Sequence, residues 1–429
     1  MKEASRAPEI MRKIADFLRI EYIQITIFGF AIAALWNSLH TLILPVQMPH
    51  FAAESEKTLW LGLLILIGLV LAMVVQPIAG AISDRSGFRW GRRRPFILVG
   101  TLLAIVFIFS IGFADSLIAI FVFYCLLQIF SNTAHGPWQG LIPDLVPEEK
   151  RGRASGAKGL FEVLGIVVIF RFAVTPLMQR YTATDGDLWL WLALGVLAAV
   201  LLGTMIVTVL KVKERPGAGG FRLPSLSTIY KSFRINTKAQ PNFIPFLVSR
   251  LLFLTPLMLV RTYGLYYLQD VAGVPQPEAV ATVGDLILVV IVSAVAVVYP
   301  AGRLADKIGR RPVTVATGFI GAVGIVPLFF SQSYAAIMFA GCILGISYGA
   351  FTSANWAMAT DLVVKDEEAR YLGLTNLASA GSTALVGLLG LVIYLLEVDI
   401  PGSGYQAMLV ASLIFFIVSS TILLRLKVR

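Results

Sequence analysis

Long apolar segments recur along the whole chain and are separated by short polar connections. Each is a continuous run of about 20 residues or more, the length that an α-helix needs to cross the hydrocarbon core of a bilayer. Membrane β-barrels show ten-residue alternating segments instead, so the pattern predicts helices. We expect twelve spans, over residues 22–47, 58–82, 95–114, 117–142, 157–179, 187–210, 243–268, 281–301, 312–331, 334–360, 372–396 and 402–424.

The composition agrees, with 57% hydrophobic and only 14% charged residues. A net charge of +10 would suggest a nucleic-acid partner in a soluble protein, but here its distribution indicates topology. Of the 35 lysines and arginines, only Lys57 and Arg180 fall on one side of the membrane, and Arg171, Arg250 and Arg261 fall inside spans. The positive-inside rule then predicts both termini in the cytoplasm, the spans in the plasma membrane, and no nucleic-acid partner.

The spans divide into two groups of six. An offset of 217 residues superimposes Cys125 on Cys342, Asp144 on Asp361 and Arg153 on Arg370. Same-sense six-helix repeats are the layout of major facilitator superfamily transporters, which predicts an all-α membrane fold of two pseudo-symmetric halves with the solute site between them. The expected parts are an interfacial segment (1–21), the first half (22–210), a cytoplasmic linker (211–242), the second half (243–424) and a cytoplasmic tail (425–429).

Two charged hairpins join spans two to three and spans eight to nine. Their glycines allow close helix approach, and their carboxylates can pair with arginines of a neighbouring helix at the cytoplasmic face. Such pairs would hold that face closed and break when the halves rock, so we expect a gating and structural role. The residues of the hairpins and of the ends of spans four and ten are Gly80, Asp84, Arg85, Arg92, Arg93, Arg94, Asp144, Arg153, Gly302, Asp306, Arg310, Arg311, Asp361 and Arg370.

A narrower resemblance lies in the first half. The hairpin segments Val75-Gln76-Pro77 and Gly91-Arg92-Arg93-Arg94-Pro95, with Asn132, Thr133 and Gly136 of span four, resemble plant sucrose–proton symporters and animal proton-associated sugar transporters. The resemblance covers about residues 45–165 and implies proton-coupled sugar transport.

Two departures from that family's pattern matter. The aspartate that is thought to carry the proton in span four aligns with Gln128, and its arginine partner aligns with Gln139. Losing both charges leaves amides that suit sugar hydroxyls, because no lone charge remains in the membrane. The inherited proton site is therefore in doubt.

Several polar residues inside spans are candidates for solute binding. Those of span four recur at i, i+4, i+7 and i+11, a stripe that cannot face lipid. Each set has the alternative of helix–helix packing. The candidates are Trp36, Asn37 and His40 in span one, Gln128, Asn132, His135 and Gln139 in span four, and Tyr348, Asn355 and Trp356 in span ten.

The intramembrane charges form a second set of candidates. Arg171 in span five and Arg250 in span seven each face a cost of about 2.5–3.5 kcal/mol, so each needs a carboxylate, carbonyl groups, water or an anionic solute. We expect Arg261 to pair with Asp285 or to extend its head group to the interface, and Glu162 to pair with a neighbouring helix. For proton coupling the candidates are Glu162, Asp285 and His135.

The sequence carries no nucleotide-binding loop, metal-spaced His/Cys cluster or nucleophile–base arrangement, so we expect no enzyme, no metal and no cofactor other than a coupling proton. The expected function is secondary active or facilitative transport of a disaccharide or other glycoside by alternating access, by a monomer and with a proton as the expected coupling ion. Two alternatives stay open: an exporter or importer of an anionic or amphipathic solute, and a non-transporting sensor or an assembly or pigment-delivery factor.

Overall fold

The computed structural model describes residues 20–184, 186–214, 241–330, 333–362 and 368–426. Within these ranges, twelve helices are long and apolar enough to cross a membrane, which confirms the predicted all-α fold. The largest difference from the predicted spans lies at the start of span five, whose helix begins at Glu148 rather than near residue 157. Its first turns are rich in Glu, Lys and Arg, which are good helix formers but lower the hydropathy.

Contacts divide the chain into two units, which are described separately. The first unit comprises Met1–Leu39 and Val70–Pro224, and the second comprises His40–Leu69 and Ser225–Arg429. Both boundaries within the first half of the chain fall inside helices of spans one and two. These two spans therefore contribute one part to each unit.

The first unit is built from the spans of the N-terminal half. Its α6 and α7 approach closely at Gly100, where an added Cβ would lie 2.7 Å from the backbone nitrogen of Ala134. A charged hairpin joins α5 to α6, and the helix ends beside it are called the hairpin end of this unit. The helices are α2 (Ile20–Thr26), α3 (Phe28–Ser38), the later part of α5 (Lys57–Asp84), α6 (Arg94–Gly112), α7 (Leu117–Gln139), α8 (Leu141–Leu145), α9 (Glu148–Leu164), the π-helical η3 (Gly165–Val174), α10 (Thr175–Thr184) and α11 (Asp187–Lys211).

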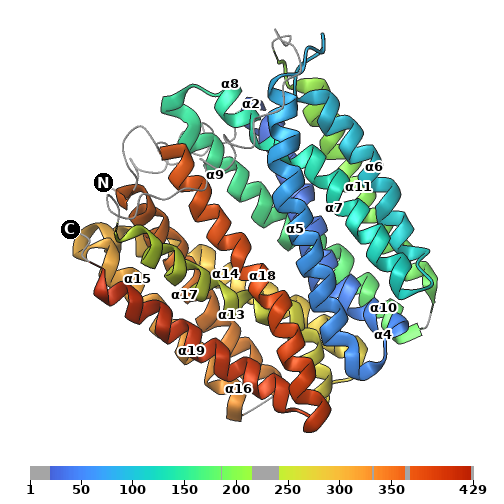
Figure 1. Ribbon diagram of the computed structural model, residues 1–429, viewed down its shortest axis with the longest axis vertical. Helices are drawn as coiled ribbons and strands as arrows, with labels where there is room; N and C mark the ends of the chain where they lie inside the picture. Colours follow the sequence, from blue (N-terminus) through green and yellow to red (C-terminus); the bar gives the residue numbers. More distant parts are fainter. Residues whose placement is uncertain (1–19, 185, 215–240, 331–332, 363–367, 427–429) are drawn as a thin grey trace, which may run out of the picture. The chain divides into compact units, whose positions relative to one another are not determined.

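The second unit holds the remaining spans, and Figure 1 shows α13, α14, α15, α17, α18 and α19 running side by side in yellow to red. Its α13 and α17 meet through Phe253 and Phe351, whose parallel rings stack with centroids 3.6 Å apart. The elements are the π-helical η1 (Leu39–Ile43), α4 (Leu44–Phe51), η2 (Glu54–Glu56), the first part of α5, α13 (Phe243–Asp270), α14 (Gln276–Ile308), α15 (Arg310–Ile325), α16 (Pro327–Phe330), α17 (Tyr334–Leu362), α18 (Glu368–Asp399) and α19 (Ser403–Arg425).

Candidate functional site

The polar stripe of span four is bonded largely within itself. Gln128 donates to the hydroxyl of Tyr124 at 2.8 Å, and Asn132 donates to the side-chain and backbone oxygens of Gln128 at 3.0 and 2.8 Å. Both amides are only 4% exposed, and Tyr124 packs edge-on against Trp36, with ring centroids 6.3 Å apart. The two amides at the middle of α7 thus form a closed polar chain inside the first unit.

The stripe continues toward the hairpin end of α7 with more accessible groups. His135 is half-buried and lies 3.1 Å from the amide nitrogen of the exposed Gln139. Its ring stacks on Trp138, whose indole N–H donates to the carbonyl of Ile25 at 2.7 Å. Trp138 therefore ties α7 to α2 and holds the His135 ring in place.

Span five contributes Glu162 to the same region. Its carboxylate lies 3.6 Å from Lys158 one turn earlier, and Lys158 lies over the Trp138 ring at 5.1 Å. The prediction that Glu162 pairs with a neighbouring helix is wrong, because the i, i+4 spacing brings Lys158 of its own helix within reach. The Glu162 side chain is 37% exposed, so protein packing does not fully enclose the ion pair.

The other candidates of spans one and five are spread along the helices. Arg171 lies in the π-helical η3, with its guanidinium 5.6 Å from the Phe172 ring. Asn37 donates to the carbonyl of Ala33 at 3.0 Å in its own helix. His40 is half-buried in η1. π-helical segments are rare in proteins, and those that occur often lie at functional sites.

Span seven carries Arg250 inside the second unit, and this arginine with the polar and aromatic side chains around it is called the Arg250 cluster. The Nε of Arg250 donates to the hydroxyl of Ser379 at 3.1 Å, and a terminal nitrogen donates to the side-chain oxygen of Asn355. The guanidinium lies 5.9 and 6.0 Å from the rings of Phe351 and Trp356. Tyr348 lies close enough to interact with it electrostatically. The structure thus brings four of the predicted candidates together: Arg250, Tyr348, Asn355 and Trp356.

The two remaining charged candidates of this unit make hydrogen bonds to hydroxyl groups. Arg261 donates to Thr41 at 3.3 Å, and Asp285 accepts from Tyr334 at 3.2 Å.

The first hairpin forms an ion-pair network. Arg93 pairs with Asp84 at 2.7 Å and with Asp144 at 2.5 Å, and Arg92 pairs with Asp144 at 2.5 Å. The hydrogen bond that the Arg92 guanidinium donates to Asp144 raises the pKa of Arg92. Glu214 accepts from the backbone nitrogens of Arg93 and Arg94 at 3.0 and 3.2 Å. Sequence analysis missed Glu214, whose only signal is its place as an acid after basic residues at the end of span six.

The remaining residues of this motif lie at its margin. Gly80 has nothing within 4 Å of an added Cβ, while Arg85 and Arg153 are exposed. Arg94 donates to the carbonyl of Trp90 at 2.9 Å.

The second hairpin places its arginines on helix carbonyls. Arg310 donates to the carbonyl of Ala357 at 2.7 Å, and Arg311 donates to that of Leu423 at 2.9 Å in the last turn of α19. Cations in these positions stabilise helix C-termini. Gly302 lies close to Ser353, and Asp306 is exposed. The side chains of Asp361 and Arg370 lie outside the described residues.

A buried lysine marks the other end of the second unit, and sequence analysis did not select it. Lys57, at the start of α5, is bonded to Asp270 at 2.8 Å and to Glu54 at 2.5 Å, and its side chain is 4% exposed. Asp270 also accepts from Tyr405 at 2.6 Å. The Lys57 ammonium lies 4.8 Å above the Tyr266 ring. This group, Lys57 with Asp270, Tyr405 and Tyr266, is called the lysine cluster.

The α5 and α18 helices touch next to the lysine cluster. An added Cβ on Gly62 would lie 2.5 Å from the carbonyl oxygen of Gly387. Tyr266 donates to the carbonyl of Pro45 at 2.9 Å, and Tyr263 donates to that of Val386 at 3.2 Å. The last turns of span one and the first turns of span two are thus bonded to span seven within the second unit, and span two also packs against span eleven.

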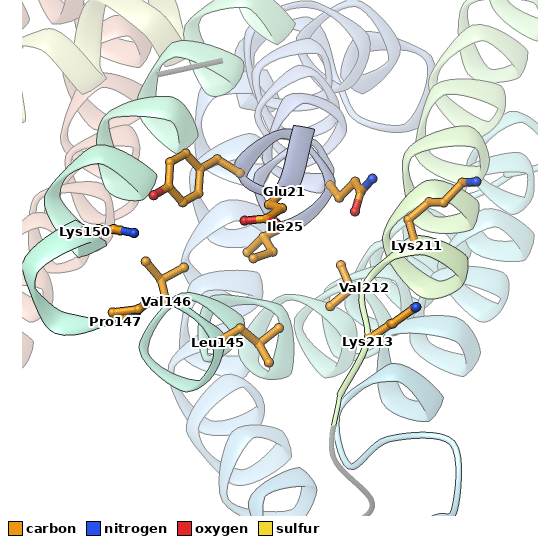
Figure 2. A pocket seen from close by; sticks show the side chains of 11 residues that line it. Glu21, Ile25, Leu145, Val146, Pro147, Lys150, Lys211, Val212 and Lys213 are labelled. Atoms are coloured by element: carbon orange, nitrogen blue, oxygen red, sulfur yellow. The ribbon is translucent and has the colours of Figure 1, made fainter. Parts of the chain in front are cut away.

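A cavity of about 520 Å³ opens at the hairpin end of the first unit. Figure 2 shows Glu21 and Ile25 of α2 facing it, with Lys150 on one side and Lys213 on the other. It is lined by helix ends and loops, and none of the predicted solute-binding residues borders it. We therefore do not assign it to the solute. In the described part of the chain, no group of three or more His, Cys, Asp or Glu residues could hold a metal ion.

Twelve helices long and apolar enough to cross a membrane, within the residues that the structure describes, define an integral membrane protein. The chain belongs to the MFS/sugar transport protein family, whose model matches residues 29–426.

Relatives of this chain are transporters. It is similar to Sucrose transport protein SUT1 of Oryza sativa subsp. japonica (26% identity over 222 residues, 45% of this chain and 40% of that protein). It is also similar to Sucrose transport protein SUC3 of Arabidopsis thaliana (27% identity, 34% and 28%) and to the General alpha-glucoside permease of Schizosaccharomyces pombe (26% identity, 39% and 33%). The matches span only 28–40% of these relatives' own length.

Solved structures show the same fold at low sequence identity. A bacterial homolog of the human lysosomal transporter Spinster, in an inward-facing and unoccupied conformation, has a TM-score of 0.73 at 15% identity, covering 94% of this chain and 95% of the other. A D-xylose–proton symporter has a TM-score of 0.70 at 14% identity, covering 95% and 97%.

Proposed function

We propose that this protein transports a disaccharide or other glycoside across the membrane by alternating access. The observation that carries the proposal is the family match over nearly the whole chain, together with relatives named for sucrose and α-glucoside transport. The activity of those relatives comes to this chain as an inference, because the alignments cover less than half of their length.

The chemistry of the candidate residues supports a sugar. Amide groups and aromatic rings, rather than pairs of opposite charges, dominate the polar positions of spans four and ten. Gln139 is exposed and Trp356 is 43% exposed, so protein packing encloses neither side chain. Amides bind hydroxyl groups as donor and acceptor at once, and an aromatic face packs against the apolar face of a pyranose ring.

Proton coupling is the second part of the proposal, with Glu162 as the proton carrier. Span four carries Gln128 where the sucrose symporters have their aspartate, so an acid elsewhere must titrate. Glu162 lies beside the accessible end of the span-four stripe, and its pairing with Lys158 gives it an alternative partner to a proton. Its side chain is 37% exposed, so protein packing does not enclose the carboxylate.

The orientation follows from the basic residues. We place the hairpin ends and both termini in the cytoplasm, because lysines and arginines concentrate on that side. The lysine cluster then lies at the external face of the plasma membrane.

The test is counterflow of labelled sucrose and maltose in proteoliposomes, with and without an inward proton gradient, beside Arg171→Ala. Sugar counterflow that the gradient drives uphill supports the whole proposal. Counterflow indifferent to the gradient supports transport without proton coupling. Absence of counterflow with any glycoside would overturn the assignment, provided that a cooperative thermal melt shows the reconstituted protein to be folded.

A further inference from the structure

Arg250 places a guanidinium, which is positively charged, inside α13. It lies seven residues after the start of the helix at Phe243, about 10 Å into the span at 1.5 Å per residue. The groups that contact it are the Ser379 hydroxyl, the Asn355 side-chain oxygen and two aromatic rings. No carboxylate of the described residues pairs with it. A charge at this depth is stabilised by carboxylates, carbonyl groups, water or an anionic solute, and the groups in contact with Arg250 here are all neutral.

The amide of Asn355 points to where that acceptor belongs. A guanidinium can only donate, so the Asn355 oxygen faces Arg250 and its NH₂ group faces away from that bond. Asn355 is 0% exposed, and its amide nitrogen has no hydrogen-bond partner among the described residues. Arg250 uses two of its nitrogens on protein oxygens, which leaves further N–H groups of the fork unassigned. The cluster therefore offers donors in excess of acceptors.

We infer that these donors bind a carboxylate carried by the solute, so that the transported glycoside is an acidic sugar such as one containing a uronic acid residue. This inference rests on the proposed function and specifies its substrate class. A carboxylate matches the planar fork of arginine with two parallel hydrogen bonds, which a lone hydroxyl cannot do. Trp356, half-exposed and 6.0 Å from the guanidinium, supplies the face for the sugar ring.

The charge of the cluster sets the charge of the solute. Arg261, the other intramembrane arginine of α13, lies eleven residues and about 16 Å further along the helix and donates to Thr41. A single group bound at Arg250 therefore meets one of the two intramembrane arginines of α13 and not both. One cation matches a singly charged carboxylate better than a doubly charged phosphate ester.

The experiment compares one sugar in its charged and neutral forms. Proteoliposome counterflow is measured for an aldobiouronic acid, for its methyl ester and for sucrose. We expect the wild-type protein to exchange the acid with a KM about 10- to 100-fold below that of the ester, the range that a charged hydrogen bond supplies. Arg250→Gln should abolish this acid-to-ester ratio, and Arg250→Lys should restore part of it because it keeps the charge without the fork.

A matched control is Arg303→Gln, which removes an exposed arginine of the same unit and should leave the ratio unchanged. If Arg250→Gln does not fold, thermal stabilisation of the wild-type protein by the acid is compared with stabilisation by the ester; equal shifts would overturn the inference. Exchange of sucrose and the ester without preference for the acid overturns the inference and leaves the proposed function standing. Failure of all three sugars to exchange overturns both.

Discussion

The lysine cluster predicts how firmly the start of span two is held to the end of span seven. The Lys57 side chain is 4% exposed and pairs with two carboxylates, of which Asp270 is 30% exposed and Glu54 is 71% exposed. The bond to Asp270 joins the two helix ends. If these ends separate during transport, into what is called the open arrangement, the Lys57–Asp270 bond must break.

The size of the effect follows from burial. Removing one partner of a buried ion pair costs about 3–5 kcal/mol. Asp270 is partly exposed and Lys57 keeps Glu54, so we reduce the expected cost of Asp270→Asn to about 1–3 kcal/mol. That free energy favours the open arrangement by about 5- to 150-fold. For Glu54→Gln, which removes an exposed carboxylate, the expected cost is below about 1 kcal/mol, or at most about fivefold.

The assay is the rate of thiol labelling at Thr58→Cys in a background in which Cys125 and Cys342 are replaced by alanine. Thr58 is 2% exposed and its hydroxyl has no hydrogen-bond partner in the described structure, so the cysteine removes no bond. A soluble maleimide should react slowly in the parent and faster by the stated factor after Asp270→Asn. Detergent-solubilised protein suffices, so the result does not depend on membrane orientation.

Two outcomes would refute the reasoning. Equal acceleration by Glu54→Gln and Asp270→Asn would show that burial does not distinguish the two bonds. The second outcome concerns the double variant that combines Lys57→Gln with Asp270→Asn, which leaves no unpaired charge buried. Faster labelling in this double variant than in Asp270→Asn alone would show that the buried Lys57 charge does not destabilise the single variant.

Three further predictions concern the first unit. Arg93→Gln should lower the unfolding temperature and the free energy of unfolding by about 1–3 kcal/mol in a detergent melt, because it leaves two carboxylates without their shared partner. Gly136→Ala should destabilise the protein, since the new Cβ would meet the backbone carbonyl of Gln76. Gly80→Ala has open space around it and should be neutral or stabilise the protein by up to about 1 kcal/mol. Thermal melts in which both variants lower the unfolding temperature, or both raise it, would contradict this prediction. Glu162→Gln should retain sugar counterflow but lose uphill uptake driven by a proton gradient, and full retention of uphill uptake would exclude Glu162 as the proton carrier.

The sequence predicted the spans well because the bilayer imposes length and apolarity on every helix that crosses it. Pairing between Asp84 and the arginines of its own hairpin was also predictable, since these residues are neighbours in the chain. The contribution of Glu214 was not, because it lies 121 residues from Arg93 and reaches it only after span six returns to the same end. Local patterns identify local pairs, and distant partners need the fold.

The candidate site shows the same limit at the level of single side chains. The i, i+4 spacing placed Gln128 and Asn132 on one face of span four, but periodicity does not show that the two amides bond to each other and are buried. Arg250 was recognisable as a costly charge, while its partners Asn355 and Ser379 lie 105 and 129 residues away. The π-helical turns at His40 and Arg171 were not predicted, because helical periodicity in a sequence does not distinguish single π-helical turns from α-helix.

The absence of charge in span four and its presence in span seven support one interpretation of specificity. Replacing both members of an ion pair by amides removes two desolvation costs together, so Gln128 and Gln139 need no compensating partner. Arg250 has no such exchange to explain it: hydrogen bonds to Ser379 and Asn355 and two aromatic rings offset part of its desolvation cost, but none of these groups carries a negative charge. A bound carboxylate would offset more of that cost than a neutral sugar would. The acid-to-ester ratio therefore measures directly why this arginine is there.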